Sequence, residues 1–225
     1  AVLTAEGLLE HNRRLALPSL PLRVGLVTSR DSAAYRDFVH ELETSGFAWR
    51  VLVADSRVQG AEAADSVVRA LTALGRCSID AIVIVRGGGS RNELAVFDAE
   101  AIARAIAAMP VPVITGIGHE IDRSIADLVA HTMLKTPTAC AAHLVGRART
   151  FHDRADQVWV RIAEQAHERA DAESRQLAAH GGATARVALA TVVVQEQRVA
   201  EAGRRLALSG DRAIEHGSLR LDSLE

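Results

Sequence analysis

Short apolar runs alternate with longer amphipathic segments over the first two thirds of the chain. Four short runs share a high content of Val, Ile and Leu, as buried strands do; they are residues 23–29, 49–55, 79–85 and 111–115. Four longer segments carry apolar residues at helical spacing; they are residues 31–46, 61–75, 92–109 and 121–131. Strand and helix in strict succession predict an α/β fold: an open, mainly parallel sheet with right-handed crossovers and helices on both faces.

The pattern changes after residue 143. Residues 144–225 contain no proline and are rich in Ala, Arg, Glu and Gln, which predicts a long helical, coiled-coil-like extension. Seven-residue spacing occurs in two rows, which are Phe151, Val158 and Gln165, and Val192, Val199, Leu206 and Ala213. Gly181 and Gly182 predict a break or reversal, so a helical hairpin and an oligomerisation segment both fit. We therefore expect an N-terminal arm and linker (1–22), an α/β domain (23–143) and a helical segment (144–225).

Charge and cysteine content narrow the class of protein. The chain has 26 basic and 28 acidic residues, a net charge of −2, which argues against a broad positive surface that grips duplex DNA. Any contact with nucleic acid must therefore be local. Cys77 and Cys140 lie far apart, without the spacing of a zinc site or a disulfide framework. Nothing resembles a signal peptide, so we expect a cytoplasmic protein without membrane contact.

Candidate chemistry lies where the predicted strands end. Arg86 ends the third apolar run and is followed by Gly87, Gly88, Gly89 and Ser90; Ser29 follows the first run, and GIGHEID (116–122) follows the fourth. Ligands of parallel sheets bind outside the carboxyl ends of the strands. A guanidinium group beside bare backbone amides suits an anion, so these exits predict a phosphate or carboxylate site. The dinucleotide pattern G-x-G-x-x-G is absent after the first strand.

Several of these stretches together carry a family resemblance. They are VGLVTSRDSAAYRD (24–37), RGGGSRNELAVFDAEAIARAI (86–106), VPVITGIGHEIDRSIADLVA (111–130) and TPTACAA (136–142). In this order they closely resemble the catalytic domain of the large subunit of bacterial exodeoxyribonuclease VII. The resemblance implies a hydrolase that degrades single-stranded DNA from its ends, in complex with a small helical subunit. It also implies that no divalent metal is required and that an oligonucleotide-binding barrel precedes this domain.

The resemblance also implies which residues carry the reaction. The positions that match the family's essential residues are Asp37, Arg86, His119 and Asp122. Arg86 and the neighbouring glycine amides could stabilise a dianionic phosphorane, and His119 could carry a proton near neutral pH. Asp122 or Asp37 would orient the imidazole or activate water. Ser29, Gly87, Gly88, Gly89, Ser90 and Glu120 are the expected contacts to phosphate or DNA, with Ser90 or Glu120 also able to cap a helix.

Other readings of the same residues stay open. Arg86 could be a surface ion pair, and His119 a buried structural histidine. A Mg²⁺ site built from His119, Glu120, Asp122 and Asp37 is conceivable, although such sites usually carry more acids. Glu93 and Asp127 fit helix-surface charges. The alternative function is a non-catalytic anion- or nucleotide-binding module with a helical interaction arm.

The resemblance implies partners for the helical segment. Small subunits would dock on it, and homo-oligomerisation through it is left open. One departure from the family pattern is Ile121, where a threonine is usual, which removes a hydroxyl from the edge of the site. Whether the chain cuts DNA without the barrel and the small subunit is also left open.

Overall fold

The computed structural model describes residues 3, 6–60, 62–87, 91–118 and 123–222. It divides into two compact units, Ala1–Gln157 and Val158–Glu225. The boundaries expected at residues 22/23 and 143/144 both fall inside the first unit, because the N-terminal segment and the start of the last helix pack against the sheet. Each unit is described by itself.

The first unit is built on a parallel sheet in the order β2-β1-β3-β4-β5. In chain order the strands are β1 (Arg23–Thr28), β2 (Arg50–Asp55), β3 (Ala81–Val85), β4 (Val113–Gly116) and β5 (Thr132–Met133). The helices are α2 (Leu8–His11), α3 (Ala33–Thr44), α4 (Ala63–Leu74), α5 (Glu100–Ala107), α6 (Ile125–Val129) and α7 (Pro137–Asp222), with 3-10 helices η1 (Asn12–Arg14) and η2 (Arg91–Asp98). The predicted α/β fold is confirmed, and the order places the ends of β1, β3 and β4 side by side.

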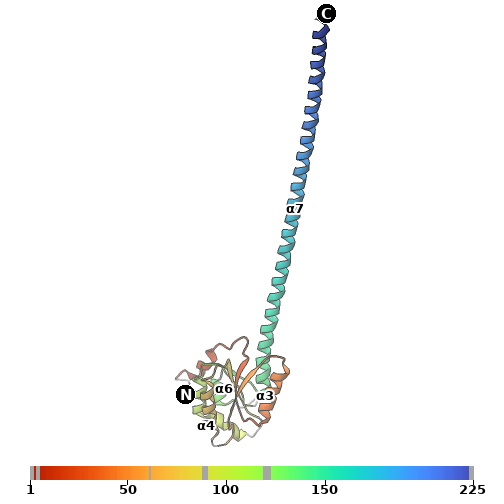
Figure 1. Ribbon diagram of the computed structural model, residues 1–225. Coiled ribbons are helices and arrows are strands. Elements are labelled where there is room, and N and C mark those ends of the chain that lie inside the picture. The colour runs from red at the N-terminus through yellow and green to blue at the C-terminus, as the bar shows by residue number, and fades with distance from the viewer. Residues whose placement is uncertain (1–2, 4–5, 61, 88–90, 119–122, 223–225) are drawn as a thin grey trace. The chain divides into compact units, whose positions relative to one another are not determined.

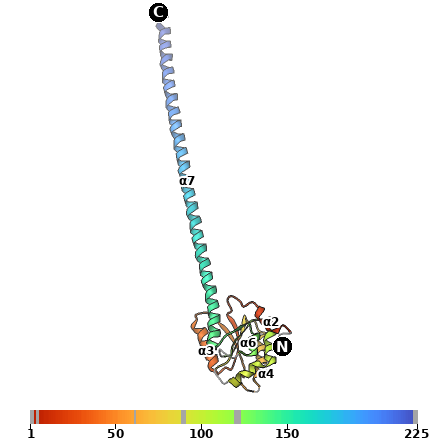
Figure 2. The same cartoon turned by 180° about the vertical axis from the view of Figure 1, so that it is seen from behind.

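Helices cover both faces of the sheet, as the strand composition predicts. The central strand β3 is buried throughout, and its side chains alternate between two hydrophobic cores. Ile82 and Ile84 pack with α4, α5 and α6, whereas Val83 and Val85 pack with α3 and the first turns of α7. Figures 1 and 2 show α3 on one side of the sheet and α4 and α6 on the other. A continuous apolar run is therefore required in β3, because water reaches neither face.

The segment after β3 departs from the sequence prediction. Instead of one helix over residues 92–109, the chain forms η2 and then α5. Ala99 separates the two because its backbone is extended, with ψ 125°. The prediction of a single helix is therefore wrong in its first half: amphipathic spacing over so short a stretch does not distinguish a 3-10 turn from an α-helix.

Buried Asn12 fastens the N-terminal segment to the sheet. Its side-chain amide donates to the carbonyl oxygens of Ile106 (3.2 Å) and Val111 (3.1 Å). Its side-chain oxygen accepts from the backbone nitrogens of Val113 (2.8 Å) and His131 (3.2 Å). One fully buried side chain thus binds four backbone groups, one in α5 and three in the segments next to or within β4 and β5.

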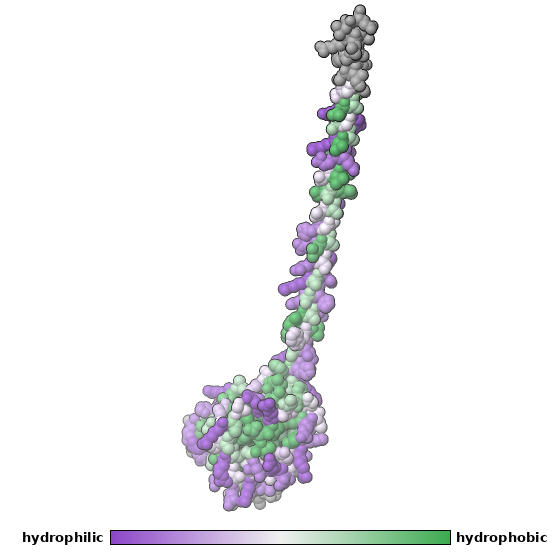
Figure 3. Space-filling model, viewed as in Figure 1, coloured by the Kyte–Doolittle hydropathy of each residue, from purple (hydrophilic) through white to green (hydrophobic). Residues whose placement is uncertain are grey.

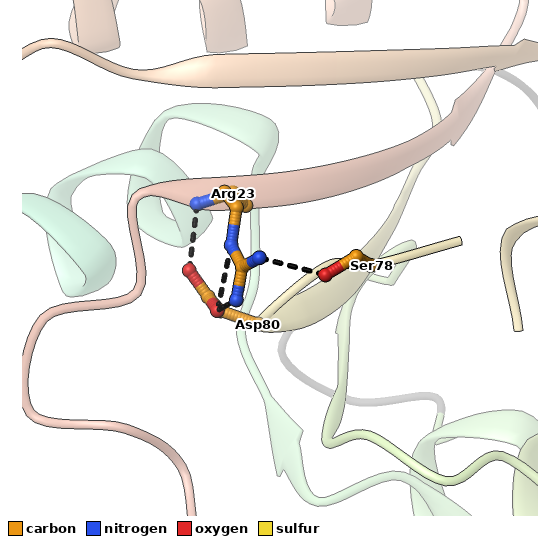
Figure 4. A network of polar contacts seen from close by, with 3 residues as sticks. All are labelled: Arg23, Ser78 and Asp80. Carbon is orange, nitrogen blue, oxygen red and sulfur yellow. Dashed lines mark hydrogen bonds and ion pairs between the residues drawn. The ribbon is translucent and has the colours of Figure 1, made fainter.

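An ion pair at the amino ends of the strands fixes the register of β1 against β3. The backbone nitrogen of Arg23 donates to Asp80 Oδ2 at 2.8 Å, and its guanidinium donates to Asp80 Oδ1 at 2.7 Å and to Ser78 Oγ at 2.7 Å (Figure 4). The hydrogen bonds to Asp80 raise the pKa of Arg23 above its usual value. In this register Val27 lies opposite Ile84, so β1 and β3 end at the same level of the sheet.

The second unit consists of the remainder of α7, which is helical through Gly181 and Gly182. The predicted break at these glycines is therefore wrong. Neither glycine has a positive φ, and each costs only about 1 kcal/mol relative to alanine, which a helix of this length absorbs.

Many large apolar side chains of this part of α7 are exposed, including Val192, Val199 and Leu206 of the predicted seven-residue row. Figure 3 shows apolar and charged side chains interleaved along the helix. An 18-residue window within Pro137–Gly210 has a mean hydropathy of 1.4, so the helix is long and apolar enough to cross a membrane. That criterion is weak, because it considers only length and composition, and the expectation of no membrane contact stays a prediction.

Candidate active site

A cavity of about 280 Å³ opens at the carboxyl ends of the strands. Segments far apart in the sequence contribute to it: the start of α3, the ends of β3 and β4, and the start of α7. The described residues that line it are Ala33, Asp37, Arg86, Gly87, Ile117, Gly118, Lys135, Thr136, Pro137 and Thr138. Three predicted site residues, Asp37, Arg86 and Gly87, thus share one cavity.

Arg86 is held at the end of β3 with only 4% of its surface exposed. Its backbone nitrogen donates to the carbonyl oxygen of Gly116 at 3.4 Å, which ties the end of β3 to the end of β4. The next residue, Gly87, lies against the first turn of α3, where a Cβ would come within 3.8 Å of the nitrogen of Ala34. A guanidinium buried to this extent is a preorganised cation, because little solvent screens its charge.

Asp37 reaches the cavity from the second turn of α3. Ser32 caps this helix by accepting from the backbone nitrogen of Tyr35 at 3.1 Å. Ala34 and Phe38 face the core, which leaves Asp37 exposed on the side toward the cavity. Asp37 is the one carboxylate among the described lining residues, and the cationic side chains of Arg86 and Lys135 line the same cavity.

The start of α7 supplies residues that sequence reasoning did not assign to the site. Thr136 caps α7 by accepting from the backbone nitrogen of Ala139 at 3.1 Å, and Pro137 occupies the first helical position, which proline favours. The positive end of the helix dipole therefore faces the cavity. The T-P-T sequence (136–138) indicates a helix start, but it does not indicate that Lys135, Thr136 and Thr138 line the cavity.

Close packing brings α7 to the end of β4. A Cβ on Gly116 would lie 2.5 Å from Sγ of Cys140 and 3.0 Å from the carbonyl oxygen of Thr136, so only glycine fits there. Burial raises the pKa of the Cys140 thiol to about 12, with a smaller contribution from Asp127. Cys140 is therefore a packing residue, and the glycine lets the cap of α7 approach the site.

Buried Asp127 ties together the two ends of the segment that carries GHEID. Thr115, at the end of β4, donates to Asp127 Oδ1 at 2.6 Å. Ser124, at the start of α6, donates to Asp127 Oδ2 from its hydroxyl at 2.8 Å and from its backbone nitrogen at 3.1 Å. The reading of Asp127 as a helix-surface charge is wrong, since only 3% of it is exposed. The capping-box spacing of Ser124 and Asp127 was the signal for this role.

A second carboxylate supports the same segment from η2. Asp98, the last residue of η2, accepts from the backbone nitrogen of Ile125 at 2.9 Å. Asp98 follows Arg86 along the chain, and Ile125 follows Gly118. This hydrogen bond therefore links the two segments after each has left the cavity. Asp127 holds Thr115 and Ser124, which flank the GHEID segment, and Asp98 holds Ile125, the next residue.

Several predicted site residues lie outside the described residues; they are Gly88, Gly89, Ser90, His119, Glu120 and Asp122. Their roles stay predictions. Ser29 lies at the end of β1, where its carbonyl oxygen accepts from the backbone nitrogen of Ser32 at 3.1 Å, and it does not line the cavity. Among the described residues no three His, Cys, Asp or Glu side chains gather in a metal-binding arrangement, and the conceivable Mg²⁺ site falls mainly on residues outside them.

The fold and the cavity define a class of protein. It is a doubly wound α/β domain with a cavity at the carboxyl edge of its parallel sheet, and two cationic side chains, one carboxylate and the starts of two helices line that cavity. A family model described as "Exonuclease VII, large subunit" matches residues 8–225. The chain therefore belongs to the family of exonuclease VII large subunits.

Curated relatives agree with this assignment. The exodeoxyribonuclease 7 large subunit of Thermotoga maritima is 34% identical over 225 residues, covering 99% of this chain and 57% of the relative. That of Syntrophotalea carbinolica is 40% identical, covering 72% and 41%, and that of Acaryochloris marina is 42% identical, covering 62% and 34%. The chain thus spans 57% or less of the length of these relatives.

Proposed function

We propose that this chain is the nuclease part of an exonuclease VII large subunit, which hydrolyses phosphodiester bonds of single-stranded DNA from the ends. The observation that carries the proposal is the cavity that both Arg86 and Asp37 line, two residues that the sequence resemblance assigns to the reaction. The proposed reaction does not require a divalent metal. The cavity supports this because Arg86 and Lys135 provide positive charge that a metal ion would otherwise provide.

The described residues suggest how the cavity assists the reaction. Attack of water on phosphorus places additional negative charge on the non-bridging oxygens. Arg86, the ammonium of Lys135 and the positive end of α7 are preorganised donors for that charge. The carboxylate of Asp37 cannot stabilise this negative charge. Its proposed role is to accept a proton from water or to orient a neighbouring group. His119 and Asp122 are the proposed proton carrier and its partner.

Small subunits are the proposed partners of the second unit. Its exposed side chains include Leu177, Val187, Val192, Val199 and Leu206, which are 54–77% exposed. A lone helix does not hold so many large apolar groups in water without a cost in free energy. A helical partner that buries these side chains would remove the cost, and a second copy of the chain could do the same.

The experiment uses the large subunit in complex with its small subunit, with single-stranded DNA and a chelator. The variants Arg86→Ala, Asp37→Asn and His119→Ala are compared with Arg76→Ala, an exposed arginine near the amino ends of the strands. Loss of one preorganised donor such as Arg86 should lower kcat by about 10²–10³-fold. The control should leave kcat unchanged.

The alternative function predicts a different outcome. A non-catalytic anion-binding module would show phosphate or DNA binding that depends on Arg86, with no hydrolysis by the wild type at any subunit ratio. Full activity of His119→Ala would remove that residue from the mechanism. Activity that disappears with the chelator and returns with Mg²⁺ would replace the metal-independent mechanism by a metal-dependent one.

A further inference from the structure

A second, larger cavity lies away from the candidate active site, between the N-terminal segment and α7. Its volume is about 460 Å³. The lining residues used below are Ser19, His143, Arg147, Thr150, Phe151 and Arg154. All of them belong to the first unit, so the cavity lies within one compact body. We refer to it as the α7 groove.

The α7 groove is cationic. Arg147 and Arg154 line it, and its described lining contains no carboxylate. The pKa of His143 is lowered, first by burial and then by the charges of Arg147 and His131, which is consistent with an excess of positive charge at this place. The whole chain has a net charge of −2, so the positive charge of the groove is a local feature.

Arg147 is already held in position. Its Nη2 donates to the carbonyl oxygen of Leu17 at 2.7 Å and its Nε to that of Pro18 at 3.1 Å. A guanidinium has further N–H groups in the same plane, and they can bind an oxyanion without losing side-chain entropy. Thr150 and Ser19 add hydroxyl groups beside it.

Phe151 adds an aromatic surface to the groove. It is 43% exposed in a chain with only 3% aromatic residues. It follows Arg147 by four positions and precedes Arg154 by three, so all three lie on one face of the helix. Arginines on either side of an exposed ring are typical of sites that bind single-stranded nucleic acid, in which a base stacks on the ring and the phosphates pair with the cations.

We propose that the α7 groove binds single-stranded DNA outside the catalytic cavity, with a base stacked on Phe151 and phosphates bound by Arg147 and Arg154. The proposal rests on the proposed function and extends it. Pro137 lines the catalytic cavity, and Phe151 lies 14 positions further along the same helix, about 21 Å at about 1.5 Å per residue. About six stacked nucleotides at about 3.4 Å each cover this distance. The groove would hold a strand whose end is being cut.

The test measures binding without cutting. A short fluorescein-labelled oligothymidylate is titrated with the large subunit in its complex, in the Arg86→Ala background and with a chelator, and Kd is followed by anisotropy at several salt concentrations. The variants are Phe151→Ala and Arg154→Glu, at exposed positions of α7. The matched control is Arg149→Glu, which changes the charge equally on the same helix but outside the groove.

We expect Phe151→Ala and Arg154→Glu each to raise Kd about tenfold. Arg154→Glu should also reduce the slope of log Kd against log salt by about 0.7, the value for one lost phosphate contact on a single strand. Arg149→Glu should bind like the parent, and thermal melting should be the same for all three. An oligothymidylate with a photoreactive base should crosslink to the peptide that contains Phe151.

Three results would overturn the proposal. The first is equal affinity for both groove variants and the parent, or an equal loss in Arg149→Glu. The second is a loss in Arg154→Glu alone, because an anion without a base would then explain it. The third is unchanged DNA affinity together with lost small-subunit binding, since the face would then serve a protein partner. The complex with wild-type Arg86 could also fail to hydrolyse DNA while the groove variants still lose affinity. That result would refute the proposed function and would support DNA binding by the groove.

Discussion

Asp127→Asn tests how the fold positions the GHEID segment. The buried carboxylate accepts from the hydroxyl of Thr115 and from the hydroxyl and backbone nitrogen of Ser124. An asparagine has nearly the same shape but keeps one acceptor oxygen, so at least one buried donor loses its partner. A buried hydrogen bond to a charged group contributes about 1.5–3 kcal/mol. We expect the free energy of unfolding to fall by about 2–4 kcal/mol.

The assay isolates the first unit by fluorescence. The chain has two tryptophans; Trp49 packs in the first unit, and Trp159, 69% exposed, belongs to the second. Urea unfolding of a Trp159→Phe background therefore reports on the first unit alone. Thr115→Val completes a double-mutant cycle, for which residues in contact show a coupling of about 0.5–3 kcal/mol. An unchanged urea midpoint for Asp127→Asn, or zero coupling with Thr115→Val, would refute the reasoning.

A structural effect must be separated from an effect on the reaction. Asp80→Asn is the matched control, because it removes a carboxylate that is hydrogen-bonded at the opposite end of the strands. At a temperature where both variants are fully folded, Asp127→Asn should lower kcat of the complex at least about tenfold, which corresponds to about 1.4 kcal/mol. Its KM should be unchanged, and Asp80→Asn should keep the kcat of the wild type.

The remaining predictions concern packing, the N-terminal segment and pH. Gly116→Ala should destabilise the first unit by about 1–3 kcal/mol in urea unfolding, and Cys140→Ala should restore only part of this, because the backbone of α7 also lies close. Asn12→Ala should cost at least about 2 kcal/mol in the same assay, because the carbonyl of Val111 and the nitrogen of Val113 lose the partner that Asn12 provides, and a smaller loss would contradict this reasoning. The lowered pKa of His143 means that the unfolded state takes up a proton first, so stability should fall as the pH drops through 6.5 and below. His143→Gln should show a weaker decline, and an identical pH profile would argue against this contribution.

Much of the sheet could be predicted because β3 is buried on both faces. Ile82 and Ile84 face one core and Val83 and Val85 the other, so the strand had to be a continuous apolar run. The two-residue strand β5 could not be predicted in this way. It pairs with β4 over two residues only, too few to produce a periodic pattern.

The candidate site could be predicted in part. The sequence predicts Arg86 at a strand exit, and the family resemblance adds Asp37 from the first helix; the fold brings both into one cavity. The contribution of Lys135 and Thr136 depends on the close approach of α7 to Gly116, a tertiary contact that no local spacing reveals. The capping-box spacing of Ser124 and Asp127 indicates only the local part of the role of Asp127; its burial and its hydrogen bond to Thr115 depend on the tertiary structure.

The helical segment shows the limit of local rules. Gly181 and Gly182 predict a break because glycine disfavours helices, yet α7 continues through both. The helix propensity of a single residue contributes little free energy, so flanking residues that favour the helix outweigh it.

The most direct test of the central claim is the rate at which the complex with the small subunit degrades single-stranded DNA in the presence of a chelator, with wild type and Arg86→Ala compared at equal concentrations. We predict that the wild type releases nucleotides from the ends and that Arg86→Ala is about 10²–10³-fold slower. Equal rates for the two proteins would contradict the assignment of this cavity as the active site.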